Sequence, residues 1–124
     1  MLYLVKVKMV KLVPPPPGQK LITEETIMQQ RNEQTDNLAR AFLALGSMED
    51  CYKLFEDLFT IREVQDLGQR LEVARLLFEK STYSEIVAKT GASTATIGRV
   101  NRALNYGAGG YKLVLDRQTE RTGD

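Results

Sequence analysis

The stretch that decides the fold is residues 82–105, Thr-Tyr-Ser-Glu-Ile-Val-Ala-Lys-Thr-Gly-Ala-Ser-Thr-Ala-Thr-Ile-Gly-Arg-Val-Asn-Arg-Ala-Leu-Asn. It contains two short helical patterns that meet at Gly91, a residue that readily takes the left-handed conformation that ends a helix. The first helix is expected over Tyr83–Thr90, because Thr82 and Glu85 have the spacing of a capping box. The second is expected over about 93–105. Two short helices joined at a glycine predict a helix-turn-helix.

The second of these helices has two very different faces. Ser93 or Thr94 is expected to cap it, and successive residues rotate by about 100° around its axis. If Ile97 points inward, then Ser93, Val100, Asn101 and Leu104 lie on the same side. The opposite side carries small and arginine side chains, namely Ala95, Gly98, Arg99 and Arg102, and it is flanked by the hydroxyl residues Thr94 and Thr96.

This outward face is unusual for a helix that only packs. A solvated face is normally filled with good helix formers such as Glu, Lys and Gln, and Gly98 costs about 1 kcal/mol relative to alanine. Small side chains let a helix approach the DNA major groove closely, where methyl groups meet thymine and arginine contacts guanine or phosphate. We therefore predict a double-stranded DNA partner. The predicted DNA-contacting residues are Ser84, Lys89, Ser93, Thr94, Ala95, Thr96, Gly98, Arg99 and Arg102.

Two other interpretations of the hairpin stay open. It could be a structural hairpin that merely packs, or a protein–protein interaction or dimerisation module without sequence-specific DNA binding. Salt dependence separates the last of these from DNA binding, because phosphate binding weakens steeply with salt and an apolar interface does not.

Composition argues against an enzyme. The 124 residues suffice for one domain, and 43% hydrophobic with 27% charged residues is ordinary for a soluble globular chain. There is no histidine, which removes the commonest general base and zinc ligand. Adjacent acids such as Glu49 with Asp50 diverge on a helix and indicate solvated surface. We expect no catalytic residues, no metal and no cofactor.

The single Cys51 favours a reducing, cytoplasmic location.

The net charge of +1 is distributed unevenly along the chain. Residues 21–60 hold eight acids and three bases, whereas residues 81–105 hold three bases and only Glu85 as an acid. DNA binding requires positive charge where the phosphates lie rather than everywhere. A mild local excess on the helix-turn-helix is adequate for a dimer.

Residues 1–27 differ from the rest of the chain. They begin with an apolar segment interrupted by Lys6, Lys8 and Lys11, which fits neither a membrane span nor a secretory signal. Pro14–Pro17 and Gly18 follow, a run that no helix or central strand crosses. We expect a disordered leader, with Met28 as a plausible natural start. The alternative is a basic arm that touches DNA phosphates.

From about Gln29 onward the pattern is helical, so the chain is predicted to be all-α. Gly46 should stop one helix and Ser47, with Asp50, should cap the next; Thr60 and Glu63 should form a capping box. An apolar stripe then runs along the longest helix through Ile61, Val64, Leu67, Leu71, Ala74 and Phe78. Such stripes are more often core than ligand pocket. Since five or six helices in roughly 90 residues bury little each, we expect an interlocked homodimer.

These motifs resemble the Trp repressor family. The stretch Gly-Ala-Ser-Thr-Ala-Thr-Ile-Gly-Arg-Val at 91–100 is similar to that family's recognition-helix segment, and Phe59-Thr60 and Leu67-Gly68-Gln69-Arg70 are similar to its long central helix. Within it, residues 69–75 and 90–97 resemble the Trp repressor-related family of bacterial regulators. The resemblance implies a Trp repressor-like helical bundle, an intertwined homodimer with two recognition helices facing adjacent major grooves, and a transcriptional repressor. We place this domain at 28–117, followed by a flexible tail at 118–124.

The resemblance also suggests a possible effector pocket. Arg70 and Arg99 fall where the repressor's arginines hold tryptophan, and Thr60 matches a further pocket residue. Val100, however, stands where the repressor has glycine, and Ala103 replaces a hydroxyl residue. We therefore expect no tryptophan co-repressor, with Arg70 and Arg99 in surface or phosphate contacts instead.

Overall fold

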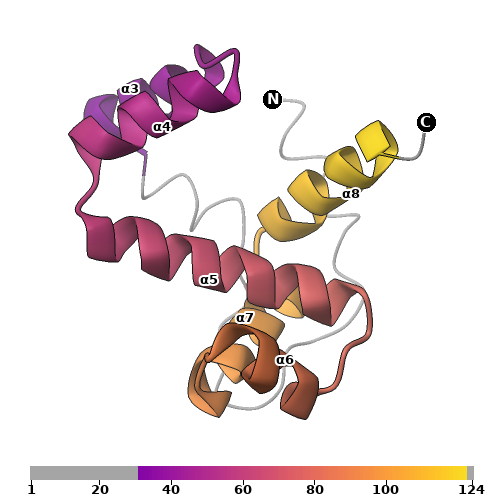
Figure 1. Ribbon diagram of the computed structural model, residues 1–124. Helices are drawn as coiled ribbons and strands as arrows, with labels where there is room; N and C mark the ends of the chain where they lie inside the picture. Colours follow the sequence, from indigo (N-terminus) through magenta and orange to yellow (C-terminus); the bar gives the residue numbers. More distant parts are fainter. Residues whose placement is uncertain (1–30, 123–124) are drawn as a thin grey trace. The chain divides into compact units, whose positions relative to one another are not determined.

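The structure is a computed structural model that describes residues 31–122, and every regular element in that range is an α-helix (Figure 1). The helices are α3 (Glu33–Leu43), α4 (Met48–Leu58), α5 (Ile61–Phe78), α6 (Tyr83–Thr90), α7 (Thr94–Tyr106) and α8 (Gly110–Thr122). The prediction of an all-α chain is confirmed. The leader predicted at 1–27 lies outside the described residues. α8 continues through Thr122, past residue 117, where the sequence analysis ended the domain.

The chain divides into two compact units, one ending at Leu54 and the other beginning at Phe55. In the first unit, α3 begins at a capping box in which the Thr35 N–H donates to Asn32 Oδ1 at 2.9 Å. The turn into α4 has the expected cap, since the Asp50 N–H donates to Ser47 Oγ at 3.1 Å. No residue of α3 or α4 is buried. Their apolar side chains are exposed or only half-buried in the single chain.

In the second unit, the two capping boxes predicted from sequence are both present. The Glu63 N–H donates to Thr60 Oγ1 and the Thr60 N–H to Glu63 Oε1. Thr82 and Glu85 exchange the same pair of hydrogen bonds at the start of α6. Each box satisfies backbone amides that the first helical turn would leave unpaired, and so determines where α5 and α6 begin.

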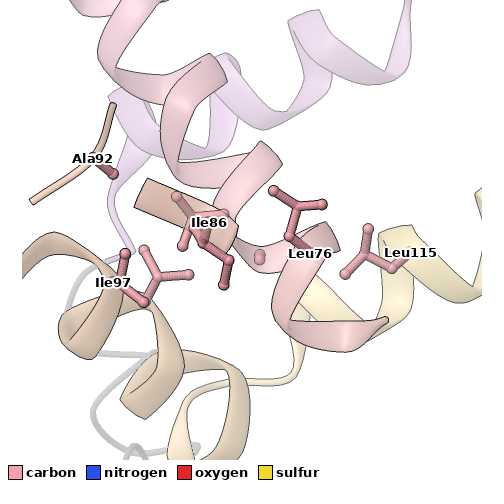
Figure 2. Close-up of a cluster of buried hydrophobic side chains, with 8 residues drawn as sticks. Leu76, Ile86, Ala92, Ile97 and Leu115 are labelled. Atoms are coloured by element: carbon pink, nitrogen blue, oxygen red, sulfur yellow. The ribbon is translucent and has the colours of Figure 1, made fainter. Parts of the chain in front are cut away.

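The core of the second unit lies around the C-terminal half of α5, where α6, α7 and α8 pack against it (Figure 1). Figure 2 shows side chains from all four helices and from the turn after α6 gathered there. The fully or almost fully buried residues are Val73, Ala74, Leu76, Ile86, Ala92, Ile97, Val100, Leu104 and Leu115.

The apolar stripe predicted along α5 is only partly buried. Ala74 is buried and Phe78 is half-buried, but Ile61 is 80% exposed and Leu67 is 43% exposed. Val73 and Leu76, which do not belong to the predicted stripe, are core residues instead. The reason is tertiary: α6, α7 and α8 all meet the C-terminal half of α5, so more than one of its sides is covered there. Within the described residues, no helix combines the length and hydrophobicity that spanning a bilayer requires.

Candidate nucleic-acid interface

The turn between α6 and α7 is held by specific hydrogen bonds. Gly91 is left-handed, with φ 72°, and its N–H donates to Val87 O at 2.9 Å. Thr90 Oγ1 donates to Ile86 O and accepts from the Ala92 N–H at 3.1 Å. The predicted first helix and its glycine stop are confirmed. These bonds fix the end of α6 and the path by which the chain leaves it toward α7.

One residue of α5 also reaches this turn. Gln69 Nε2 donates to Thr90 O at 3.2 Å, which ties the end of α6 to the middle of α5. In the sequence, Gln69 stands out only as part of the motif at 67–70, and this contact was not predicted. No local pattern indicates it, because the two residues are 21 positions apart.

The inner face of α7 anchors the helix in the core. Ile97 is 0% exposed, Val100 is 3% exposed and Leu104 is 8% exposed, which confirms the predicted inward side for its apolar residues. Of the polar residues placed on that side, Asn101 is half-buried and Ser93 is exposed. Ile86 of α6 and Ala92 of the turn join the same cluster, as Figure 2 shows. The buried apolar side chains of α7 therefore lie on the side that packs against α5 and α6.

Ser93, rather than Thr94, caps α7. The Thr96 N–H donates to Ser93 Oγ at 3.1 Å, and Ser93 Oγ donates to Thr96 Oγ1 at 3.0 Å. Thr94 therefore keeps its hydroxyl free for other partners. The first turn of α7 contains no acid. Its N-terminus, where unpaired N–H groups and the helix dipole favour negative charge, is consequently suited to a phosphate.

All nine residues predicted to contact DNA belong to this helix-turn-helix. Thr94, Ala95, Arg99 and Arg102 are exposed on α7, and Thr96 and Gly98 are partly exposed between them. Ser93 is exposed at the cap, and Ser84 and Lys89 are exposed on α6. The structure brings the predicted set together on adjacent elements.

Gly98 is not required by packing within the chain. A Cβ built at this position would lie 3.7 Å from Arg102 Nη1, an ordinary van der Waals contact with the end of a flexible side chain. Alanine would fit and would favour the helix by about 1 kcal/mol. Within the part of the chain that the structure describes, nothing accounts for a glycine in the middle of α7.

The cations of this surface differ in their surroundings. Arg99 and Arg102 form no hydrogen bond or ion pair with any described residue. Lys89 lies near Glu72 of α5, whose pKa is lowered first by its hydrogen bond to Arg75 and more weakly by the charges of Arg75 and Lys89. The two arginines of α7 are therefore the cations available to an outside anion.

The three residues proposed for an effector pocket have different roles. Thr60 is the N-cap of α5, so its hydroxyl already accepts a hydrogen bond from Glu63. Arg70 on α5 and Arg99 on α7 are both exposed, and no hydrogen bond or ion pair joins either to a described residue. Val100 is buried in the core where α5 and α7 pack together.

These features define a helix-turn-helix protein whose second helix presents cationic and small side chains outward. Residues 33–119 match the Trp repressor protein family, and the chain belongs to that family. The resemblance seen in the sequence is thereby confirmed. Over 90 residues the chain is 53% identical to the uncharacterized protein YerC of Bacillus subtilis (strain 168), which covers 73% of this chain and 86% of YerC.

Two solved structures are also similar to this chain. One is a candidate Trp repressor from Staphylococcus aureus, with a TM-score of 0.72 and 44% identity, covering 75% of this chain and 93% of that one. The other is a TrpR-like protein from Eubacterium eligens ATCC 27750, with a TM-score of 0.68 and 48% identity, covering 77% of this chain and 95% of that one. Both support the six-helix fold described above.

Proposed function

We propose that this protein is a sequence-specific DNA-binding transcriptional regulator that reads the major groove with α7. It acts in the cytoplasm as a repressor, by occupying an operator, and it requires neither a catalytic site nor a cofactor. Membership of the Trp repressor family supports DNA binding in general. The observation that carries the proposal for this chain is the outer face of α7, where a helix-weakening glycine lies among small residues and two unpaired arginines.

The composition of this face fits DNA better than it fits a protein partner. Arg99 and Arg102 bring two charges that an apolar interface would have to desolvate. Because Gly98 has no side chain, the backbone of α7 can lie close to the floor of the DNA major groove. Thr94 and Ala95 add methyl groups that match thymine.

We further propose that the working unit is an intertwined homodimer. In the second unit, Ile61, Leu67 and Leu71 are 80%, 43% and 38% exposed on α5. Gly68 lies among them in the middle of the helix, and a Cβ there would meet nothing within 4 Å. An apolar helix face with a glycine at its centre suits close packing against a second copy, which would bring two α7 helices to adjacent major grooves.

Substitutions at Gly98 test the DNA proposal. Genomic fragments that co-purify with the protein would supply the operator, and fluorescence anisotropy would measure its affinity over a range of salt concentrations. Gly98→Glu should abolish binding, because an acidic side chain would meet the phosphates at the closest approach. Gly98→Ala should raise helix stability by about 1 kcal/mol and still weaken binding.

The matched control is Gln118→Glu, which introduces an acidic side chain at an exposed position of α8. This variant should bind the operator like wild type. Wild-type binding should fall steeply with salt, with a slope set by the number of phosphate contacts. If Gly98→Glu binds the operator like wild type, α7 does not read DNA. Binding that is insensitive to salt would favour a protein-interaction surface instead.

A further inference from the structure

A cavity of about 570 Å³ opens at the other end of the second unit, away from the N-terminus of α7. It lies between the end of α5, the second half of α7 and the start of α8. Leu77, Phe78 and Leu104 supply its apolar lining, while Lys80, Lys112 and two asparagines supply most of its polar lining. No carboxylate side chain of a described residue lines it. The cavity therefore combines apolar surface with two positive charges.

Lys80 occupies a backbone position that favours glycine. It is the one described residue other than glycine with a positive φ, 69°. The Ser81 N–H donates to Leu76 O and the Lys80 N–H to Leu77 O, both at 3.0 Å, which is a Schellman motif with lysine at the left-handed position. A lysine in the last helical turn would serve the α5 dipole equally well without the cost of this conformation.

Lys112 is also in an unfavourable local position. It lies in the first turn of α8, which contains no acid. The positive end of a helix dipole disfavours a cation there. Lys80 therefore carries the conformational cost of a left-handed position, Lys112 opposes the dipole of α8, and both lysines line the same cavity. Departures from local preference of this kind are expected where a residue serves a ligand.

The polar groups of the cavity are available to an acceptor. Neither lysine forms an ion pair with a described residue, and the nearby Glu79 is already bound to Arg75 Nη1 at 2.8 and 3.0 Å. Asn105 Nδ2 donates to Asn101 Oδ1 at 3.0 Å, which leaves the Asn101 amide N–H groups free to donate. The free groups that face the cavity are thus predominantly hydrogen-bond donors.

From these observations we infer that the cavity binds a small organic anion that has an apolar body and a carboxylate or phosphate group. The anion would lie between Lys80 and Lys112, and the apolar body would lie against Phe78 and Leu104. None of these residues belongs to the possible effector pocket at Thr60, Arg70 and Arg99. The inference does not depend on DNA binding, since it rests on the cavity alone.

The test uses the full-length protein with benzoate and phenyl phosphate as probes and neutral benzamide as the comparison. Amide chemical shifts followed by NMR should move saturably around Ser81 and Asn105 with at least one anion, at millimolar concentration or below. Comparing the two anions distinguishes a carboxylate ligand from a phosphate ligand. Benzamide should bind at least about tenfold more weakly than the better anion.

Two substitutions remove the charges without threatening the fold. Lys80→Gly supplies the residue that the left-handed position favours, and Lys112→Gln removes a cation from a helix N-terminus. Each substitution should weaken anion binding about tenfold. Each variant protein should unfold at the same temperature as wild type or at a higher one. Lys53→Gln, an exposed lysine of α4, is the control and should change nothing. The proposal would be overturned if benzamide bound as well as the anions, or if neither anion gave a saturable shift. It would also be overturned if both substitutions left anion binding unchanged.

Discussion

Single residues of α7 divide between two tasks. Ile97, at 0% exposure, holds the helix to the core, whereas Arg102 is exposed and has no partner among the described residues. These tasks separate stability from DNA affinity, so substitutions on the two faces should have different consequences.

Arg102→Ala should weaken operator binding by about 1–3 kcal/mol if the arginine contacts a base, or lower the salt slope by about one if it contacts a phosphate. Its unfolding midpoint should stay near that of wild type. Ile97→Ala should instead cost about 2–5 kcal/mol of stability and lose DNA binding only as a consequence. Anisotropy and denaturant unfolding of the same preparations measure both effects. An Arg102→Ala variant with unchanged affinity and salt slope would show that this arginine does not touch DNA.

Val100 determines our expectation for tryptophan. Its side chain is 3% exposed within the core cluster, and we propose that it fills space an indole would need. Isothermal calorimetry should therefore detect no saturable binding of tryptophan at micromolar concentrations, and added tryptophan should not change DNA affinity. Val100→Gly serves as the comparison, since it reopens part of that space. Micromolar binding by wild type would contradict the expectation.

At the scale of the element, capping residues define the helices. Thr82→Ala should destabilise the protein by about 0.5–2 kcal/mol, because it removes the acceptor for the Glu85 N–H at the start of α6. Ser84→Ala, at the exposed second position of the same helix, is the control and should change stability little. Thermal unfolding followed by circular dichroism compares them. Equal midpoints for the two variants would mean that the cap contributes nothing measurable.

The capping box of α5 should respond to acid. The backbone hydrogen bond from Thr60, with a further contribution from its side chain, lowers the pKa of Glu63 below the usual value of about 4.5. Because the pKa of Glu63 is lower in the folded state, the capping box stabilises the fold at pH values above about 4.5. This stabilisation is lost as the pH falls through the folded-state pKa of Glu63. An NMR titration of the Glu63 carboxyl should therefore have its midpoint below about 4.5. Thr60→Ala should return the midpoint toward that value.

At the scale of the whole molecule, the single chain leaves much apolar surface uncovered. Leu43 and Met48 are 85% and 72% exposed in the first unit, and Ile61 is 80% exposed in the second. Exposure of this extent on several helices is more typical of an interface than of a monomer surface. It supports the homodimer that we propose.

Sedimentation should accordingly find a dimer at micromolar concentration. Gly68→Leu should shift it toward monomer, because the added side chain would occupy the space of a closely packed second copy. Gly98→Leu is the matched control: it changes another helical glycine with room for a Cβ, and it should leave the dimer intact. A stable, folded wild-type monomer would refute the proposal, as would a dimer indifferent to Gly68→Leu.

The sequence by itself determined the two helices of the helix-turn-helix, the capping boxes of α5 and α6, and the turn at Gly91. Thr60 with Glu63, Thr82 with Glu85, and Gly91 act through contacts within a few residues, so their spacing is sufficient to predict them. The inward side of α7 also followed from helical periodicity. The predicted DNA-contacting residues could be placed on one surface for the same reason, because most of them lie on a single helix.

Tertiary structure alone decided which sides of α5 are buried. A helical pattern gives candidate faces, but the three helices that pack around its C-terminal half select Val73 and Leu76 while leaving Leu67 exposed. The bond from Gln69 to Thr90 and the cavity between Lys80 and Lys112 likewise join residues distant in the chain. Such contacts depend on how helices pack against one another, and no local spacing records that arrangement.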